Sequence, residues 1–432
     1  MLYIGIDWAT DSHTVTLLGA TGEVLESLAI ENRLAGFLTL LETIRKHMSK
    51  LEPAATSKSV SFAIEDQNQR LTDFLLAQDF QGHLIEPSRM KGYRLRYRSS
   101  GNKTDPDDSF ILADVLYRDH NQLPRMAPDS EVIRALKTLL RDREGFVRDS
   151  TRLTNRLTAC LRQYYPEALG FFEDVAGKTV LDFIAAFPDF AAACCLSRGA
   201  VKRFLAEHHC NRETQLERIM AVLGSSPTPV PTVVVRTKRQ QALAIIQQLH
   251  AVQAAVADYD AEIERLGKEN DEVQRFRGLP GGGSITGAGL STLFGEDRSR
   301  FTSAMSVQSL AGTAPKTIQS GQFRTACFRF GCNRFYRMLL QQMALGALRR
   351  SAWAKQYYRG KRKEGKTHQH ALRCLANLLL KIAYAIWRDR TEYSEDRHLA
   401  QIMRHHLRPT SNSVRHSEST AYCLPSAITS SC

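Results

Sequence analysis

The stretch Tyr3-Ile4-Gly5-Ile6-Asp7 decides the fold of the first part of this 432-residue chain. It is an apolar run that ends on a carboxylate, as a buried strand with a functional end would. A second such run, Val60-Ser61-Phe62-Ala63-Ile64-Glu65, ends on Glu65. Asp105 and Asp108 follow, three residues apart at the start of a helical pattern, so both carboxylates share one helix face.

The four acids Asp7, Glu65, Asp105 and Asp108 therefore predict one site. Carboxylates within about 5 Å of each other would repel by roughly 3 kcal/mol per pair at an effective dielectric constant of 20. Two divalent cations remove this repulsion, and a two-metal site is a common means of activating phosphodiester chemistry. We therefore expect a metal-dependent protein that acts on nucleic acid.

The order of predicted elements indicates how these acids come together. Strands at 3–7, 13–18 and 24–30 form a meander, and a helical pattern covers 35–48. A strand at 60–65, a helix at 69–77, a short strand at 83–86 and a helix from Asp105 follow. This order, βββαβαβα, predicts an α/β ribonuclease-H-like (RuvC-like) domain. Its parallel crossovers place the strand ends at Asp7 and Glu65 side by side.

The charge distribution favours a polyanionic partner. The net charge is +13 and the isoelectric point is about 9.4. One basic cluster without acids runs from Arg89 to Lys103, and another runs from Arg324 to Arg373 with Glu364 as its single acid. Aromatic residues are interleaved with both, as stacking on bases would require. The candidate nucleic-acid contacts are Arg94, Arg96, Arg98, Lys103, Arg324, Arg329, Arg334 and Arg337. A solvated basic face with core aromatics is the alternative.

The cysteines and the hydropathy suggest an intracellular setting. Nine cysteines form no metal-ligand pattern, and His208-His209-Cys210 has no second ligand pair nearby in the sequence, which favours a surface turn over a zinc site. No signal peptide precedes the first strand, and no apolar run is long enough for a membrane span. We expect reduced thiols, a cytoplasmic protein and no membrane partner.

The middle of the chain is predicted to be helical. Residues 131–164 form one long basic helix, which could follow a phosphate backbone or pack as an ordinary helix. After a breaker at 225–231, apolar residues recur at spacings of three and four: Ala242, Ile245, Leu249, Val252, Val256, Tyr259, Ile263 and Leu266. This seam predicts a coiled coil or long helical hairpin. We favour a dimerisation arm; the alternative is an intrachain antiparallel pair with 131–164.

The third block is predicted to be mainly α-helical. It opens with a Pro-Gly turn at 277–290 that resembles a helix-hairpin-helix motif, in which backbone N–H groups at Gly281 and Gly283 would meet DNA phosphate. Ser320 precedes Gly321, between Ala314-Pro315 and the second basic cluster. A lone serine here is more often a turn residue than a nucleophile, since serine needs activation at neutral pH.

Taken in order, these motifs resemble those of the DEDD insertion-sequence transposases. The first half is carried by Gly5-Ile6-Asp7-Trp8-Ala9, Ala63-Ile64-Glu65 and the segment 103–108. The second half is carried by Leu279-Pro280-Gly281, Phe301, the segment 310–315, Ser320-Gly321 and Gly331-Cys332-Asn333. The resemblance covers about 1–160 and 270–390. It departs from the family at Phe330, where a basic residue is usual, and at the additional acid Asp107.

The resemblance implies a mobile-element recombinase that acts on donor and target DNA and is guided by a bridge RNA. It implies that Asp7, Glu65, Asp105 and Asp108 hold Mg²⁺, two ions per site, and that Ser320 forms a covalent phosphoserine–DNA intermediate. It also implies a homo-oligomer, in which the acids of one subunit meet the serine of another.

The expected division of the chain has four parts. These are a RuvC-like DEDD domain (1–130), a helical region with the long basic helix and coiled-coil arm (131–270), a serine transposase domain (271–390) and a partly disordered tail (391–432). Two other functions stay open. A metal-dependent junction nuclease would hydrolyse DNA with the same acids and no covalent intermediate, and a non-catalytic scaffold would only bind nucleic acid.

Overall fold

The computed structural model describes residues 1–51, 56–65, 69–85, 87–97, 105–123, 125–126, 129–321 and 323–400. Most of the predicted tail therefore lies outside the described residues. The chain divides into two compact units. The described parts of unit 1 lie within 1–131 and 294–334, and those of unit 2 lie within 132–293 and 335–400.

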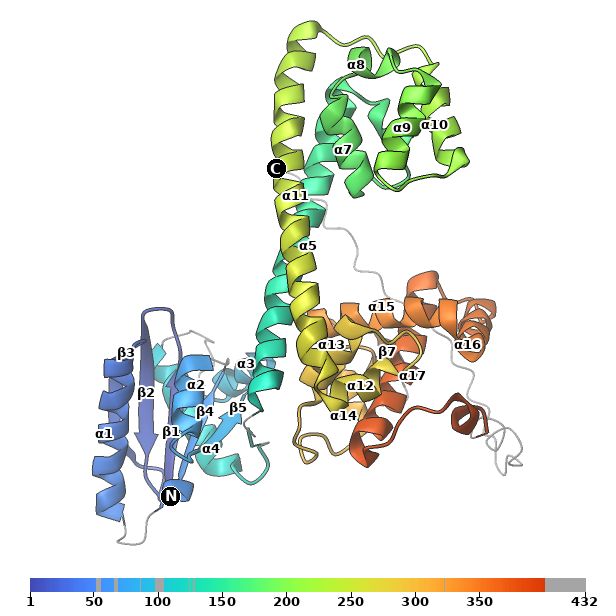
Figure 1. Ribbon diagram of the computed structural model, residues 1–432. Helices are drawn as coiled ribbons and strands as arrows, with labels where there is room; N and C mark the ends of the chain where they lie inside the picture. Colours follow the sequence, from blue (N-terminus) through green and yellow to red (C-terminus); the bar gives the residue numbers. More distant parts are fainter. Residues whose placement is uncertain are drawn as a thin grey trace. The chain divides into compact units, whose positions relative to one another are not determined.

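Unit 1 contains a five-stranded mixed sheet with the strand order β3-β2-β1-β4-β5 (Figure 1). Strands β1 (Leu2–Asp7), β2 (Ser12–Leu18) and β3 (Val24–Glu31) form the antiparallel meander. Strands β4 (Val60–Ile64) and β5 (Gln81–Leu84) continue the sheet in parallel from β1. The predicted mixed α/β arrangement of the first part of the chain is confirmed.

Alternation along the strands divides the core of the sheet between its two faces. Leu2, Ile4 and Ile6 face one side, where they pack with α1 (Leu34–Leu51) and α2 (Gln69–Leu76). Tyr3 and Ala63 face the other side with α3 (Pro87–Tyr97) and α4 (Asp105–Asp119). A 3₁₀ turn, η1 (Ser57–Ser59), leads into β4. Asp7 and Glu65, in step with Tyr3 and Ala63, belong to the α4 side.

A glycine brings helix α4 onto strand β1. A Cβ added at Gly5 would lie 2.0 Å from the Ser109 carbonyl oxygen and 2.4 Å from the Ala113 nitrogen. Only a residue without a side chain allows this approach. The contact is reinforced by a buried hydrogen bond of 2.8 Å between the hydroxyl groups of Thr16 and Ser109. Gly5 thereby sets the height of α4 above the strand that ends at Asp7.

The second part of unit 1 carries the serine motif. Helix α14 (Ala304–Leu310) is followed by a two-stranded antiparallel hairpin, β6 (Lys316–Ser320) and β7 (Phe323–Cys327). The backbone N–H of Ser130, which lies between α4 and α5 (Glu131–Tyr164), donates to the Glu296 carboxylate at 2.7 Å. This hydrogen bond joins the serine-bearing part to the segment that follows the sheet domain. The expectation of a mainly helical third block did not include this hairpin, because its short strands lack an apolar alternation and β6 is exposed throughout.

Unit 2 contains a long antiparallel helix pair, α5 (Glu131–Tyr164) and α11 (Thr232–Lys268) (Figure 1). Phe146 meets Tyr259 at a centroid distance of 5.5 Å, and the Cys160 thiol lies 3.5 Å from the Lys238 carbonyl oxygen. The seam residues Ala242, Ile245, Leu249 and Ile263 are buried within the chain. The favoured interpretation of this seam as a dimerisation surface is therefore wrong for these residues, and the intrachain pair describes them.

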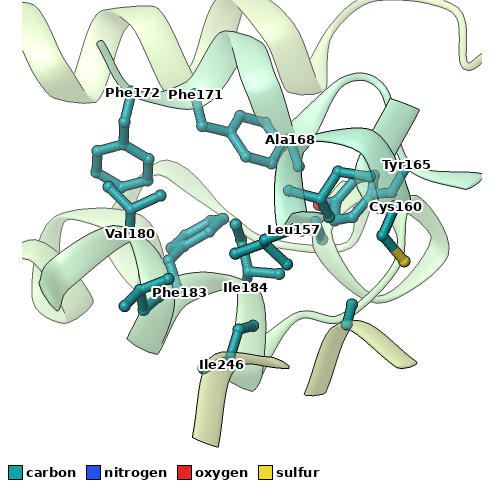
Figure 2. Close-up of a cluster of buried hydrophobic side chains, with 14 of the residues drawn as sticks. Leu157, Cys160, Tyr165, Ala168, Phe171, Phe172, Val180, Phe183, Ile184 and Ile246 are labelled. Atoms are coloured by element: carbon teal, nitrogen blue, oxygen red, sulfur yellow. The ribbon is translucent and has the colours of Figure 1, made fainter. Parts of the chain in front are cut away.

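Five short helices close a core of their own between α5 and α11. They are α6 (Ala168–Phe171), α7 (Lys178–Ala186), α8 (Phe190–Cys194), α9 (Arg198–Glu207) and α10 (Glu213–Leu223). Phe171, Phe183 and Ile184 pack there with Leu157 of α5 and Ile246 of α11 (Figure 2). The proline-rich segment predicted as a breaker separates α10 from α11.

The remaining helices of unit 2 follow α11 and include those that hold the Pro-Gly turn. They are α12 (Asp271–Arg277), α13 (Ser284–Phe294), α15 (Arg334–Arg350), α16 (Ala352–Lys363) and α17 (His368–Asp389). The turn between α12 and α13 rests on α15, because a Cβ at Gly281 would lie 2.0 Å from the Met343 carbonyl oxygen. None of the helices in the described ranges is both long and apolar enough to cross a membrane.

Candidate metal centre and nucleophile

Three of the four predicted acids meet at one edge of the sheet. One carboxylate oxygen from each of Asp7, Glu65 and Asp108 lies within 4.8 Å of the other two. Asp7 is 8% exposed and Asp108 1%, so two of the three carboxylates are buried. Asp105 is the first residue of α4, and its side chain lies outside the described part of the chain.

The positions of these acids follow from the sheet. Ile6 pairs with Ile64 in the parallel ladder, so Asp7 and Glu65 come next at the same edge. Helix α4 crosses β1 at Gly5 and places Asp108 beside the ends of these strands. Hard oxygen donors held this closely fit a divalent cation such as Mg²⁺ or Mn²⁺. The site is compatible with divalent-metal use.

Arg94 of α3 completes the cluster. Its Nε donates to Asp108 Oδ1 at 2.6 Å, and its Nη2 donates to Asp108 Oδ2 at 2.9 Å and to Glu65 Oε2 at 3.0 Å. The hydrogen bond to Asp108 and the charges of Asp108, Glu65 and Asp7 raise the pKa of the Arg94 guanidinium, against the opposing effect of burial. In this structure Arg94 thus binds acids, whereas the sequence predicted a contact with nucleic acid.

Helix α3 was absent from the sequence prediction. Its one available signal was Pro87, which suits the first turn of a helix. The helix is anchored at its far end by Tyr97, whose hydroxyl donates to the buried carboxylate of Asp114. Arg118 donates to the same carboxylate at 2.7 Å. This anchoring keeps Arg94 over the acidic cluster.

Ser320 is placed at the tip of the β6–β7 hairpin. It pairs with Phe323, and Gly321 follows it with a φ of +55°, a conformation that glycine adopts readily. All five residues of β6 are exposed. Ser320 is thus the last residue of β6, next to the turn, on an exposed hairpin, and its role as a nucleophile stays a prediction.

The other predicted nucleic-acid contacts are placed unequally. Arg96 and Arg334 are exposed, and Arg337 is half-buried on α15. Arg329 donates to the carbonyl oxygens of Ala314 and Pro315 at 3.3 and 3.4 Å. Arg98, Lys103 and the side chain of Arg324 lie outside the described residues. Contact of these residues with nucleic acid stays a prediction.

The two glycines of the turn differ in their surroundings. Gly281 has a φ of +76° and lies against the backbone of α15, which gives it a packing role. A Cβ at Gly283 would meet nothing within 4 Å, so the backbone before α13 is open at that position. A phosphate contact at either glycine stays a prediction, and Gly283 is the position where a side chain would test it without disturbing the packing.

The fold and the site define a class: a mixed α/β protein with clustered carboxylates suited to divalent-metal chemistry. Residues 4–166 match a family model described as a transposase, of the IS110 DEDD type, and residues 273–359 match the transposase IS116/IS110/IS902 family. Together these matches span more than half of the chain. The chain belongs to this IS110 family of insertion-element transposases, enzymes that cleave and transfer DNA.

Three bacterial relatives match this chain over nearly their whole length. A mini-circle protein named as the transposase for IS117 in Streptomyces coelicolor is 29% identical over 93% of this chain and 97% of its own. The uncharacterized 44.8 kDa protein of insertion element IS116 in Streptomyces clavuligerus is 28% identical over 90% and 95%. The IS900 protein of Mycobacterium paratuberculosis is 26% identical over 91% and 97%.

Proposed function

We propose that this transposase cuts and rejoins DNA through Mg²⁺ held at Asp7, Glu65, Asp105 and Asp108, and through a covalent bond to Ser320. The observation that carries the proposal is the approach of three carboxylates within 4.8 Å at the ends of β1 and β4 and on α4. The family implies a RuvC-like N-terminal domain, which agrees with the mixed sheet.

The acids would act on the scissile phosphate. Mg²⁺ bound there would neutralise charge on the phosphate during the displacement. Asp7 and Glu65 are fixed by the sheet and Asp108 by the contact of α4 with Gly5, so their geometry exists before substrate arrives. Such preorganisation avoids rearrangement during the reaction.

Ser320 would supply the nucleophile. The hydroxyl loses its proton and its oxygen forms a bond to phosphorus, while the bond from phosphorus to one deoxyribose oxygen breaks and the released oxygen gains a proton. The phosphodiester is exchanged for a phosphoserine ester, so a DNA hydroxyl can later reverse the step without ATP. The exposed tip of the β6–β7 hairpin allows DNA to reach this hydroxyl.

The partners belong to the same proposal. Donor and target DNA would be held by the basic residues near both motifs, and a bridge RNA would guide their choice. A homo-oligomer would bring the acids of one subunit to Ser320 of another. Most of the apolar seam of α11 is used within the chain, so the surface that joins subunits must include other residues.

A covalent-adduct assay tests the proposal. The protein is incubated with Mg²⁺, RNA transcribed from the flanking DNA and labelled DNA that spans the element junction, then denatured and digested. We expect labelled DNA on the peptide that contains Ser320. Ser320→Ala should abolish the adduct, whereas Thr317→Ala, which removes another exposed hydroxyl of β6, should retain it. Cleaved DNA without an adduct would establish the hydrolytic nuclease instead.

A further inference from the structure

We propose that Arg94 is a counter-ion that occupies the acidic cluster before catalysis and moves to the DNA phosphate when metal binds, so that metal and DNA binding strengthen each other. This inference rests on the proposed use of metal by Asp7, Glu65 and Asp108. It assigns Arg94 a positioning role in the loading of the site.

The hydrogen bonds of Arg94 compete with metal coordination. Its guanidinium takes both oxygens of Asp108 and Oε2 of Glu65, at 2.6 to 3.0 Å. A Mg²⁺ ion would need oxygens of the same carboxylates at about 2.0–2.1 Å. A divalent cation on these oxygens would stand next to the guanidinium, and the two positive charges would repel. Full metal occupancy therefore requires the guanidinium to withdraw.

The cluster needs this cation when metal is absent. Three carboxylates within 4.8 Å, two of them buried, repel one another. Arg94 forms ion pairs with Glu65 and Asp108, and its side chain is 19% exposed. An arginine stays charged at any ordinary pH, so the neutralisation does not depend on protonation. Arg94 thus holds the ligands in position and lowers their affinity for metal.

Nucleic acid offers the guanidinium a second partner. A phosphate that reaches the metal must come close to Asp108 and Glu65, and its oxygens match the guanidinium fork as a carboxylate does. Helix α3 is held by Tyr97 on Asp114 and by buried Met90, so the movement lies in the long Arg94 side chain. Because DNA removes the competitor, DNA must raise metal affinity, and metal must raise DNA affinity by the same factor.

Mn²⁺ binding to the full chain tests this coupling. Free Mn²⁺ is measured by electron paramagnetic resonance with and without a short DNA duplex. In the absence of DNA, we expect Arg94→Gln to bind Mn²⁺ at least tenfold more tightly than the unaltered protein. DNA should tighten Mn²⁺ binding by the unaltered protein by a larger factor than it tightens binding by Arg94→Gln. Arg45→Gln, an equal charge change at an exposed position on α1, should behave as the unaltered protein.

A second variant guards against a folding defect. Arg94→Lys keeps the charge and loses the two-pronged contact, so its Mn²⁺ affinity should fall between those of the unaltered protein and Arg94→Gln. Equal or weaker Mn²⁺ binding by both variants, with unchanged melting curves, would overturn the role of Arg94. If the unaltered protein binds no more Mn²⁺ than Asp7→Asn, with or without DNA, the proposed metal function itself fails.

Discussion

The acidic cluster and the serine hairpin of unit 1 are built in opposite ways. The carboxylates of Asp7 and Asp108 are buried where β1 and α4 meet, with core residues on both faces of the sheet behind them. Ser320 ends a strand whose five residues are all exposed. Ile318 and Phe323 beside it remain 43% and 64% exposed.

The two sites therefore owe the positions of their side chains to different contacts. The cluster is held by the same packing that stabilises the sheet, so its arrangement is fixed once the chain folds. An isolated two-stranded hairpin is marginally stable in water and needs further packing. We infer that the acids provide a fixed frame and that nucleic acid or another subunit completes the setting of Ser320.

The largest expected effect is the loss of cleavage on Asp7→Asn. The substitution preserves shape and removes one charge from the metal ligands, so DNA cleavage should fall at least about a thousandfold, since metal sites supply several kcal/mol of transition-state stabilisation. Cleavage of labelled junction DNA measures the effect, and a gel-shift assay without divalent metal should show retained DNA binding. Near-normal cleavage would remove Asp7 from the site.

Gly5→Ala should disturb the packing of α4 on β1 that positions the acidic cluster. The new Cβ would lie 2.0 Å from the Ser109 carbonyl oxygen, so α4 must move away from β1. We expect unit 1 to lose about 3 kcal/mol of stability, as for other overpacked cores, with lower Mn²⁺ affinity. Urea unfolding measures the first effect. Gly92→Ala is the matched control, because a Cβ there meets nothing within 4 Å.

Gly321→Ala should act only on the hairpin. Its φ of +55° costs an alanine roughly 1–2 kcal/mol, while no atom lies within 4 Å of the added Cβ. Hydrogen exchange of the β6–β7 amides should accelerate by about 5- to 30-fold, with the melting temperature of the sheet unchanged. Gly331→Ala, which is also unobstructed, should leave exchange in the hairpin as it is. Faster exchange in the strands of the five-stranded sheet as well would contradict the separation of the acidic cluster from the hairpin.

The smallest effect concerns Tyr97, which anchors α3. Burial and the hydrogen bond to Asp114 raise the pKa of Tyr97 to about 12. Because the folded pKa exceeds the unfolded value of about 10, the contribution of this group to stability is complete below pH 10 and is lost as the pH rises through 12. Tyr97→Phe should cost about 1 kcal/mol near neutral pH. A difference absorbance titration of the two proteins should show the phenolate forming well above pH 10; a transition near 10 would disprove the anchor.

The sequence pattern predicted the five-stranded sheet well, because β1 and β4 are apolar runs and Asp7 and Glu65 come directly at or after their ends. The predicted helix from Asp105 correctly placed Asp108 near Asp7 and Glu65. The position of Arg94 could not be predicted, since charge spacing alone does not distinguish an arginine that meets phosphate from one that meets acids. The hairpin was missed because its exposed strands lack an apolar alternation. The seam of α11 was predicted correctly as a helical contact, but its partner depends on tertiary packing.

The α5–α11 pair has a consequence for folding during synthesis. Arg143 and Asp260, which form an ion pair across it, are 117 residues apart. At a synthesis rate of roughly 5–20 residues per second, α11 is completed on the order of ten seconds after α5. The apolar face of α5 lacks its partner helix during that time. During that interval the five short helices can cover only the far end of α5, near Leu157. Ile133, Leu136 and Leu140 pack with Ile263, so this half of α5 lacks that partner until the later residue has been synthesised.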